Sequence, residues 1–128
     1  MTDYYEQMAD RVSTIHEQRE RELRNLVLFK TDSPTDDDIA EARTLMNSYY
    51  RLCGLSERNM YLANDERTAN SSYTKKSEDR ESRWCARLNS QFAKLYGLNL
   101  VYCGYYPRIG IKYEGGGFSQ KVSTFFYN

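Results

Sequence analysis

Residues 75–97 read KKSEDRESRWCARLNSQFAKLYG, and this stretch separates charged from apolar side chains. Six polar residues recur at steps of four, three, four, four and three, so at about 100° per residue they fall on one stripe of a helix. They are Lys76, Arg80, Arg83, Arg87, Gln91 and Lys94. The apolar residues of the stretch cluster roughly 80° to 180° away from that stripe. They are Trp84, Cys85, Leu88, Phe92 and Leu95. The pattern predicts a helix from about Lys75 to Tyr96 with one basic face.

The residues after this helix change to a pattern typical of strands. Gly97 stands where a helix is expected to end, because glycine readily adopts the left-handed conformation of a C-terminal cap. Three later segments are rich in β-branched and aromatic residues, with alternation in the middle one, and they predict three antiparallel strands. These segments are 98–106, 109–113 and 121–127. Pro107 and the glycines at 115–117 are expected in the two connections.

The residues before the basic helix predict further helices. Residues 2–30 are rich in Glu, Arg, Gln and Leu and predict a long first helix with an incomplete apolar stripe. Its middle, residues 17–24, alternates acids and arginines. The part before that middle is therefore expected to project from the body or to pair with another copy.

A second helix is expected to begin after Pro34, where three successive aspartates supply the negative charge that a helix N-terminus favours. Gly54 is its expected end, and a separate short helix is expected within 56–68. The fold class predicted from these patterns is α+β. Three or four N-terminal helices would pack against a C-terminal three-stranded antiparallel β-meander in a single domain, 1–128, with a helical part at about 2–97 and a β part at about 98–128.

Charge is distributed unevenly along the 128 residues. Residues 1–74 carry nine Lys/Arg against fourteen Asp/Glu, and residues 75–128 carry nine against four, so the halves have net charges of −5 and +5. The asymmetry fits either an anionic partner on the second half or two halves that complement each other within one fold. A neutral whole lacks the basic excess of a non-specific nucleic-acid binder.

Cysteine usage and the N-terminal residues favour a cytoplasmic protein. Cys53, Cys85 and Cys103 lie far apart, so neither a disulfide framework nor a CxxC metal pair is available. The first residues lack the basic and apolar regions of a secretion signal, and no run is apolar enough to span a bilayer. We therefore expect a cytoplasmic location and no membrane partner.

Candidate catalytic or cofactor-binding residues are few. His16 is the single histidine and lies in a Glu-rich helical context, where a solvated surface position is expected. The aspartates at 36–38 lack the ligand spacing of a calcium loop, and the glycines at 115–117 are followed by no helix of a phosphate-binding loop. The sequence therefore predicts a non-enzymatic protein without a metal or cofactor.

The function predicted from the basic helix is binding of nucleic acid or of a nucleoprotein. Cations at steps of three and four can meet successive phosphate oxygens, and tyrosines on the neighbouring strands can offer faces to bases. The expected binding residues are Lys76, Arg80, Arg83, Arg87, Lys94, Tyr105, Arg108 and Lys112. A solvated helix face, partly neutralised by Glu78, Asp79 and Glu81, would give the same pattern without function.

The alternative function is a protein-interaction module. A small inhibitor or accessory factor of phage or mobile-element type could use its acidic helical half against a basic target, or could form a homodimer. The expected acidic site is then Asp36, Asp37 and Asp38. Nucleic-acid binding would weaken steeply with salt and with charge reversal at Arg83 and Arg87, whereas the alternative would respond to changes at the aspartates.

Overall fold

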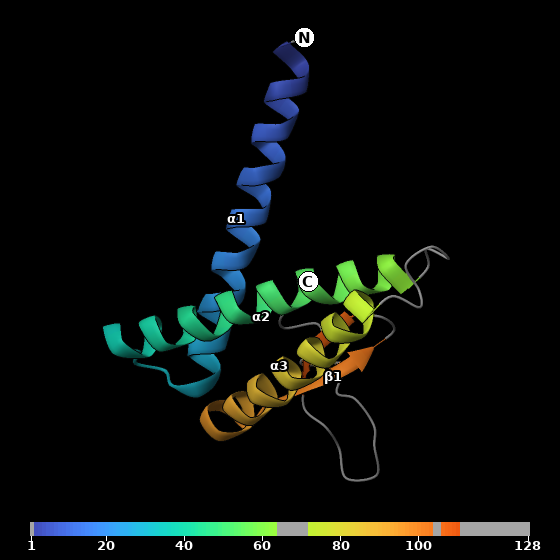
Figure 1. Cartoon of the computed structure of the whole chain (residues 1–128). Helices are drawn as coiled ribbons and strands as arrows, with labels where there is room; N and C mark the ends of the chain where they lie inside the picture. Colours follow the sequence, from blue (N-terminus) through green and yellow to red (C-terminus); the bar gives the residue numbers. More distant parts are fainter. Residues whose placement is uncertain (1, 64–71, 104–105, 111–128) are drawn as a thin grey trace.

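The computed structural model describes residues 2–63, 72–103 and 106–110, which form three long helices followed by two short strands. The elements are α1 (Thr2–Lys30), α2 (Asp36–Ala63), α3 (Ser72–Tyr96), β1 (Asn99–Cys103) and β2 (Tyr106–Gly110). Figure 1 shows α2 crossing the lower part of α1, with α3 packed beside α2 and the strands next to α3.

The predicted α+β fold with a three-stranded meander is wrong. Helices of 29, 28 and 25 residues make up most of the described chain, and its strands are two five-residue segments paired antiparallel. Segment 98–106 was expected to be one strand, but it holds all of β1 and the first residue of β2. The many Leu, Val and Tyr residues of this segment suggested one long strand, but they fit a short hairpin that packs on the helices. The third expected strand, 121–127, lies outside the described residues.

The second helix does not end at Gly54. Helix α2 continues to Ala63, so the separate short helix expected within 56–68 is the last part of α2 as far as the structure describes it. Burial explains the continuation, because Ser56 and Asn59, which follow Gly54, are 3% and 4% exposed. Asn59 donates to the Ser77 carbonyl oxygen at 3.1 Å and to Glu81 at 2.7 Å. Tertiary contacts of this kind outweigh the low helix propensity of one glycine.

A reciprocal cap starts α2. The backbone N–H and the hydroxyl of Thr35 both donate to Oδ2 of Asp38 at 3.0 Å, and the N–H of Asp38 donates to the Thr35 hydroxyl at 3.2 Å. This is a capping box with Asp in the place of the usual Glu. The predicted helix start after Pro34 is confirmed, and its physical basis is this pair of residues.

The core lies where the three helices and the hairpin meet. It takes apolar side chains from every element except β1, whose Leu100 is half-buried against it. The fully buried large side chains are Leu26, Met46, Leu52, Leu88, Phe92, Leu98, Pro107 and Ile109. Edge-to-face contact between Tyr49 and Phe92, with ring centroids 6.2 Å apart, joins α2 to α3.

The end of α3 and the start of β1 are fixed by backbone hydrogen bonds. Gly97 has a φ of 69°, its N–H donates to the Ala93 carbonyl at 3.0 Å, and the N–H of Leu98 donates to the Phe92 carbonyl at 3.2 Å. The predicted glycine cap is therefore confirmed. Asn89 of α3 then accepts from the Leu100 N–H at 2.8 Å, which holds β1 against the helix.

The first part of α1 projects from the body, as the sequence pattern predicted (Figure 1). Every residue from 3 to 18 is exposed, whereas Leu23, Leu26 and Val27 near the other end are buried. We call residues 3–18 the arm. The body begins near Arg19, whose guanidinium lies 4.5 Å from the centre of the Tyr50 ring.

Candidate nucleic-acid interface

The five cations predicted from the helical wheel all lie on α3, and all five are exposed. We call these residues the basic face: Lys76, Arg80, Arg83, Arg87 and Lys94. At 1.5 Å per residue, the face extends about 27 Å along the helix, and its three arginines lie within about 10 Å of one another along the axis. The structure therefore brings these predicted site residues together in one row.

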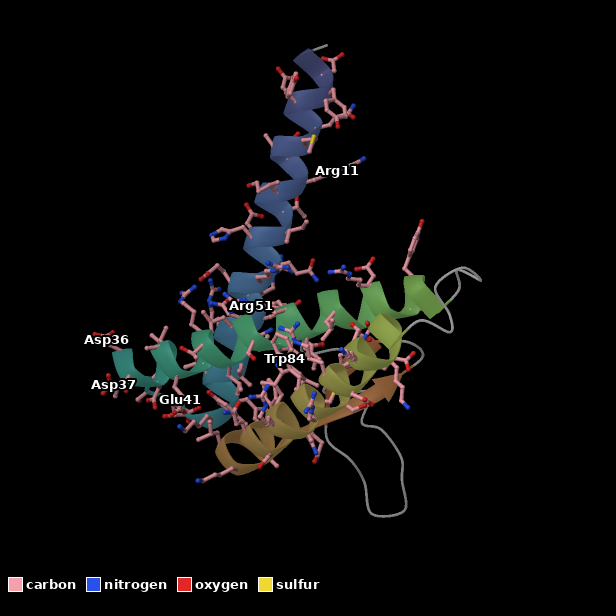
Figure 2. All side chains as sticks on the ribbon, viewed as in Figure 1. Arg11, Asp36, Asp37, Glu41, Arg51 and Trp84 are labelled. Atoms are coloured by element: carbon pink, nitrogen blue, oxygen red, sulfur yellow. The ribbon has the colours of Figure 1, made fainter. Side chains whose placement is uncertain are left out.

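The opposite face of α3 sets the orientation of the row. Leu88 and Phe92 are 2% and 0% exposed in the core, so the helix cannot turn its arginines inward without exposing them. Trp84 is half-buried, and its indole N–H donates to the Ser48 hydroxyl of α2 at 3.0 Å. Figure 2 shows Trp84 where α2 and α3 lie against each other.

The basic face is not neutralised by the rest of the described chain. No carboxylate in residues 2–63, 72–103 or 106–110 forms an ion pair with any of its five cations. Asp79 lies four residues before Arg83, which is the spacing at which helical ion pairs form, yet this pair is absent. Glu81 accepts a hydrogen bond from Asn59 of α2.

Two cations outside the basic face, Lys30 and Arg43, do form ion pairs. Lys30 lies 3.1 Å from Glu41 and 3.7 Å from Asp38, and Arg43 binds Glu20 through both guanidinium nitrogens at 2.7 and 3.3 Å. Arg43 lowers the pKa of the Glu20 carboxyl by hydrogen bonding. The charges of Lys30 and Arg43 are thus compensated where α1 meets α2, whereas the five cations of the basic face are exposed without an ion pair to a described carboxylate.

The surface is hollowed at the basic face. One shallow depression is lined by Arg80, Arg83, Ala86 and Arg87, so three arginine side chains lie around the small side chain of Ala86. Arg87 also lines a neighbouring groove between α2 and α3, together with Ser48, Trp84, Leu88 and Gln91. We call this second feature the α2–α3 groove.

The α2–α3 groove was not predicted from the sequence. Ser48 lies 36 positions from Trp84, so the α2 side of the groove depends on tertiary packing. The sequence contained one sign of this groove. Trp84 has an N–H donor on a large apolar ring, and a buried indole N–H needs an acceptor on a neighbouring element. Gln91, the uncharged member of the predicted stripe, lines the groove and is exposed.

The remaining predicted interface residues are placed only in part. Arg108 belongs to β2, opposite Val101 of β1, and the structure does not describe its side chain. Tyr105 and Lys112 lie outside the described residues. The contribution of the hairpin to the interface therefore stays a prediction.

The three aspartates of the alternative acidic site have different surroundings. Asp38 caps α2 and pairs with Lys30, and the hydrogen bonds from Thr35 hold the pKa of its carboxyl below the ordinary value. Asp36 and Asp37 are exposed at the start of α2, away from Arg51 in the middle of that helix (Figure 2). Asp38 thus has a structural role.

The residues considered for other chemistry are dispersed. His16 is exposed on the arm, and Cys53 and Cys85 are half-buried free thiols. In the part of the chain that the structure describes, no group of three or more His, Cys, Asp or Glu side chains is placed to hold a metal ion. No helix in the same part is long and apolar enough to cross a bilayer.

Comparison with protein-family models, with curated proteins and with solved structures found no match for this chain. We therefore infer the function from the geometry and charge of α3 and its neighbours.

Proposed function

We propose that this protein binds nucleic acid without catalysing a reaction, and that the basic face of α3 contacts the phosphate backbone. The observation that carries the proposal is a row of exposed cations without ion pairs to any described carboxylate, in a protein whose other cations include paired ones.

The spacing of the row suits phosphates. Double-stranded DNA carries one negative charge per roughly 1.7 Å of its axis, so a face about 27 Å long meets many phosphates at once. Arg80, Arg83 and Arg87 surround one depression, and guanidinium groups bind phosphate oxygens in pairs of parallel hydrogen bonds. Three arginines around a small alanine can thus hold adjacent phosphates.

The α2–α3 groove offers a polar neighbour to this phosphate contact. Gln91 is exposed, and its amide has the donor and acceptor needed to hydrogen-bond a base edge. We therefore propose that Arg80, Arg83 and Arg87 supply affinity, and that Gln91 contacts a base or sugar. We propose Tyr105, Arg108 and Lys112 as further contact residues, on the sequence pattern alone.

The proposal places the protein in the cytoplasm. Cys53 and Cys85 support this, because both are free thiols in the described structure and secreted domains of this size commonly rely on disulfides.

Charge reversal tests the proposal. We expect labelled DNA or RNA duplexes and single strands to bind the unaltered protein at low salt, and we expect Arg83→Glu combined with Arg87→Glu to weaken that binding at least tenfold in fluorescence anisotropy. The matched control is Arg21→Glu combined with Arg24→Glu, which changes net charge equally at exposed positions of α1 outside the arm.

Two results would contradict the proposal. One is the absence of binding to every nucleic acid at low salt. The other is equal weakening by the α3 variant and the α1 control, which would show a response to net charge alone. All four altered arginines are exposed, so both variants should remain folded. Circular dichroism of each variant checks this expectation.

A further inference from the structure

The arm presents an apolar stripe that the described structure leaves uncovered. Its large apolar side chains remain 46% to 72% exposed, although helices in folded proteins normally bury such a stripe. These residues are Tyr4, Tyr5, Met8, Val12 and Ile15.

The spacing of the stripe is that of a coiled-coil seam. Tyr5, Met8, Val12 and Ile15 are separated by three, four and three residues, which are the a and d positions of two heptads. Such a seam is narrower than the face that a helix buries in a globular core. It suits packing against one other helix.

The residues that flank the seam on both sides are uncharged, with the exception of one arginine. In this heptad assignment the flanking e and g positions contain no carboxylate. They are Tyr4, Ala9, Arg11, His16 and Gln18. The acids of the arm occupy the b and f positions, which point away from the seam. They are Asp3, Glu6, Asp10 and Glu17. A second acidic arm can therefore approach the seam without bringing carboxylates together.

We propose that the arm pairs with the arm of a second copy of this chain, in antiparallel orientation. In the matching register Tyr5 lies opposite Ile15 of the second copy, and Met8 lies opposite its Val12. All four layers are then apolar, and the two Ala9 residues face each other near the twofold axis.

The length of the arm supports the antiparallel register. In this register Thr2 of one copy lies beside Gln18 of the other, one residue short of Arg19 and its contact with Tyr50. The two arms thus overlap along their whole exposed length and stop where each body begins. Antiparallel helices also set their dipoles in opposition, which favours this orientation over the parallel one.

The apolar area that the arm exposes is large enough for a weak dimer. With roughly 200 Å² for a full tyrosine side chain and about 150 Å² for Met, Val or Ile, the five side chains expose on the order of 500 Å² per arm. A pair of arms would bury about 1,000 Å², which is near the lower limit for a specific interface. We therefore expect a concentration-dependent dimer.

The helix itself gains from such pairing. A helical segment of about 16 residues is marginal in water without tertiary contacts. Pairing supplies the contacts that the body does not provide to residues 3–18.

Sedimentation equilibrium of the full chain over about 5 to 200 μM tests the pairing. We expect a mass that rises toward twice the 15.1 kDa of the chain. Met8→Glu combined with Val12→Glu should hold the mass at that of the monomer. The control, Gln7→Glu combined with Ser13→Glu, adds the same charge on the outer side of the arm and should keep the dimer. All four positions are exposed, so these changes leave the core intact.

Cysteine cross-linking tests the orientation. Under mild oxidation Ala9→Cys should form a disulfide-linked dimer well above the yield of the unsubstituted chain, because the two copies of residue 9 meet only in the antiparallel pair. Ile15→Cys should not exceed that yield, because its copies would lie about 15 Å apart along the axis. A monomer at 200 μM overturns the proposal, and so does cross-linking through Ile15→Cys in place of Ala9→Cys.

Discussion

The hydroxyl of Tyr49 in α2 donates a hydrogen bond to the Pro107 carbonyl oxygen of β2 at 2.9 Å, across 58 positions of the chain. Both residues are buried, so this bond connects the hairpin to the helical core away from the protein surface. Loss of one partner in such a place leaves the other unsatisfied, which costs more than the bond itself contributes.

Tyr49→Phe should therefore lower the free energy of unfolding by about 1–3 kcal/mol, because the Pro107 carbonyl would lose its donor. Urea titration followed by circular dichroism measures the change. Tyr61→Phe is the control, since Tyr61 is 78% exposed and its change should be close to zero. Equal effects of the two substitutions would contradict the role of the Tyr49 bond.

Gly54→Ala should stabilise the protein by about 1 kcal/mol, because Gly54 lies inside α2 and alanine is the better helix former. A Cβ atom added there would meet nothing within 4 Å. Thermal unfolding would show a raised midpoint. A lowered midpoint would mean that the helix ends at Gly54, as the sequence pattern had suggested.

Tyr96→Phe should leave the protein equally stable or stabilise it by up to about 1 kcal/mol at neutral pH, because the Tyr96 hydroxyl is buried without a hydrogen-bond partner among the described residues. Burial, with Glu41 and Asp38 nearby, raises the pKa of Tyr96 to about 12 from 10.0. Below pH 10 Tyr96 is neutral in both the folded and the unfolded state, and as the pH rises from about 10 to about 12 its ionisation in the unfolded chain lowers the stability of the folded state.

Chemical denaturation of Tyr96→Phe and the unaltered protein between pH 8 and pH 11 measures this dependence. The unaltered protein should lose stability more steeply above about pH 10. Parallel curves would show that Tyr96 ionises as it does in the unfolded chain.

Asp38→Asn should lower the melting temperature at pH 7, because Asp38 completes the cap with Thr35 and pairs with Lys30. Hydrogen bonds from Thr35 lower the pKa of Asp38 from its ordinary 3.8. Its stabilising effect is therefore present above about pH 4 and is lost as the pH falls through the lowered pKa. Melting curves at pH 7 and pH 2.5 should show a difference that closes at the lower pH. Asp37→Asn, at an exposed neighbouring position, is the control.

Local patterns predicted the helices well and the β part poorly. The period of Leu88 and Phe92, the cap at Gly97 and the acidic start at Asp38 each depend on neighbouring residues, so they can be found in a sequence. The continuation of α2 past Gly54 depends on Asn59 contacting α3, and no local signal shows such a contact. Apolar density after Leu98 favours strands, but it does not fix their length or number.

The candidate site could likewise be predicted from the sequence only in part. The helical period places Arg80, Arg83 and Arg87 on one face, and the structure describes that face as exposed. The depression around Ala86 and the groove beside Trp84 could not be predicted, because they arise from the packing of α2 against α3.

The salt dependence of nucleic-acid affinity tests the central claim most directly. Each phosphate contact on duplex DNA contributes about −0.9 to the slope of log K against log salt concentration, so Arg83→Gln combined with Arg87→Gln should make the slope shallower by about 1.8. Anisotropy titrations from 50 to 300 mM salt measure both slopes, with Arg21→Gln combined with Arg24→Gln as the control that keeps the original slope. An unchanged slope in the α3 variant would contradict a phosphate contact at the basic face.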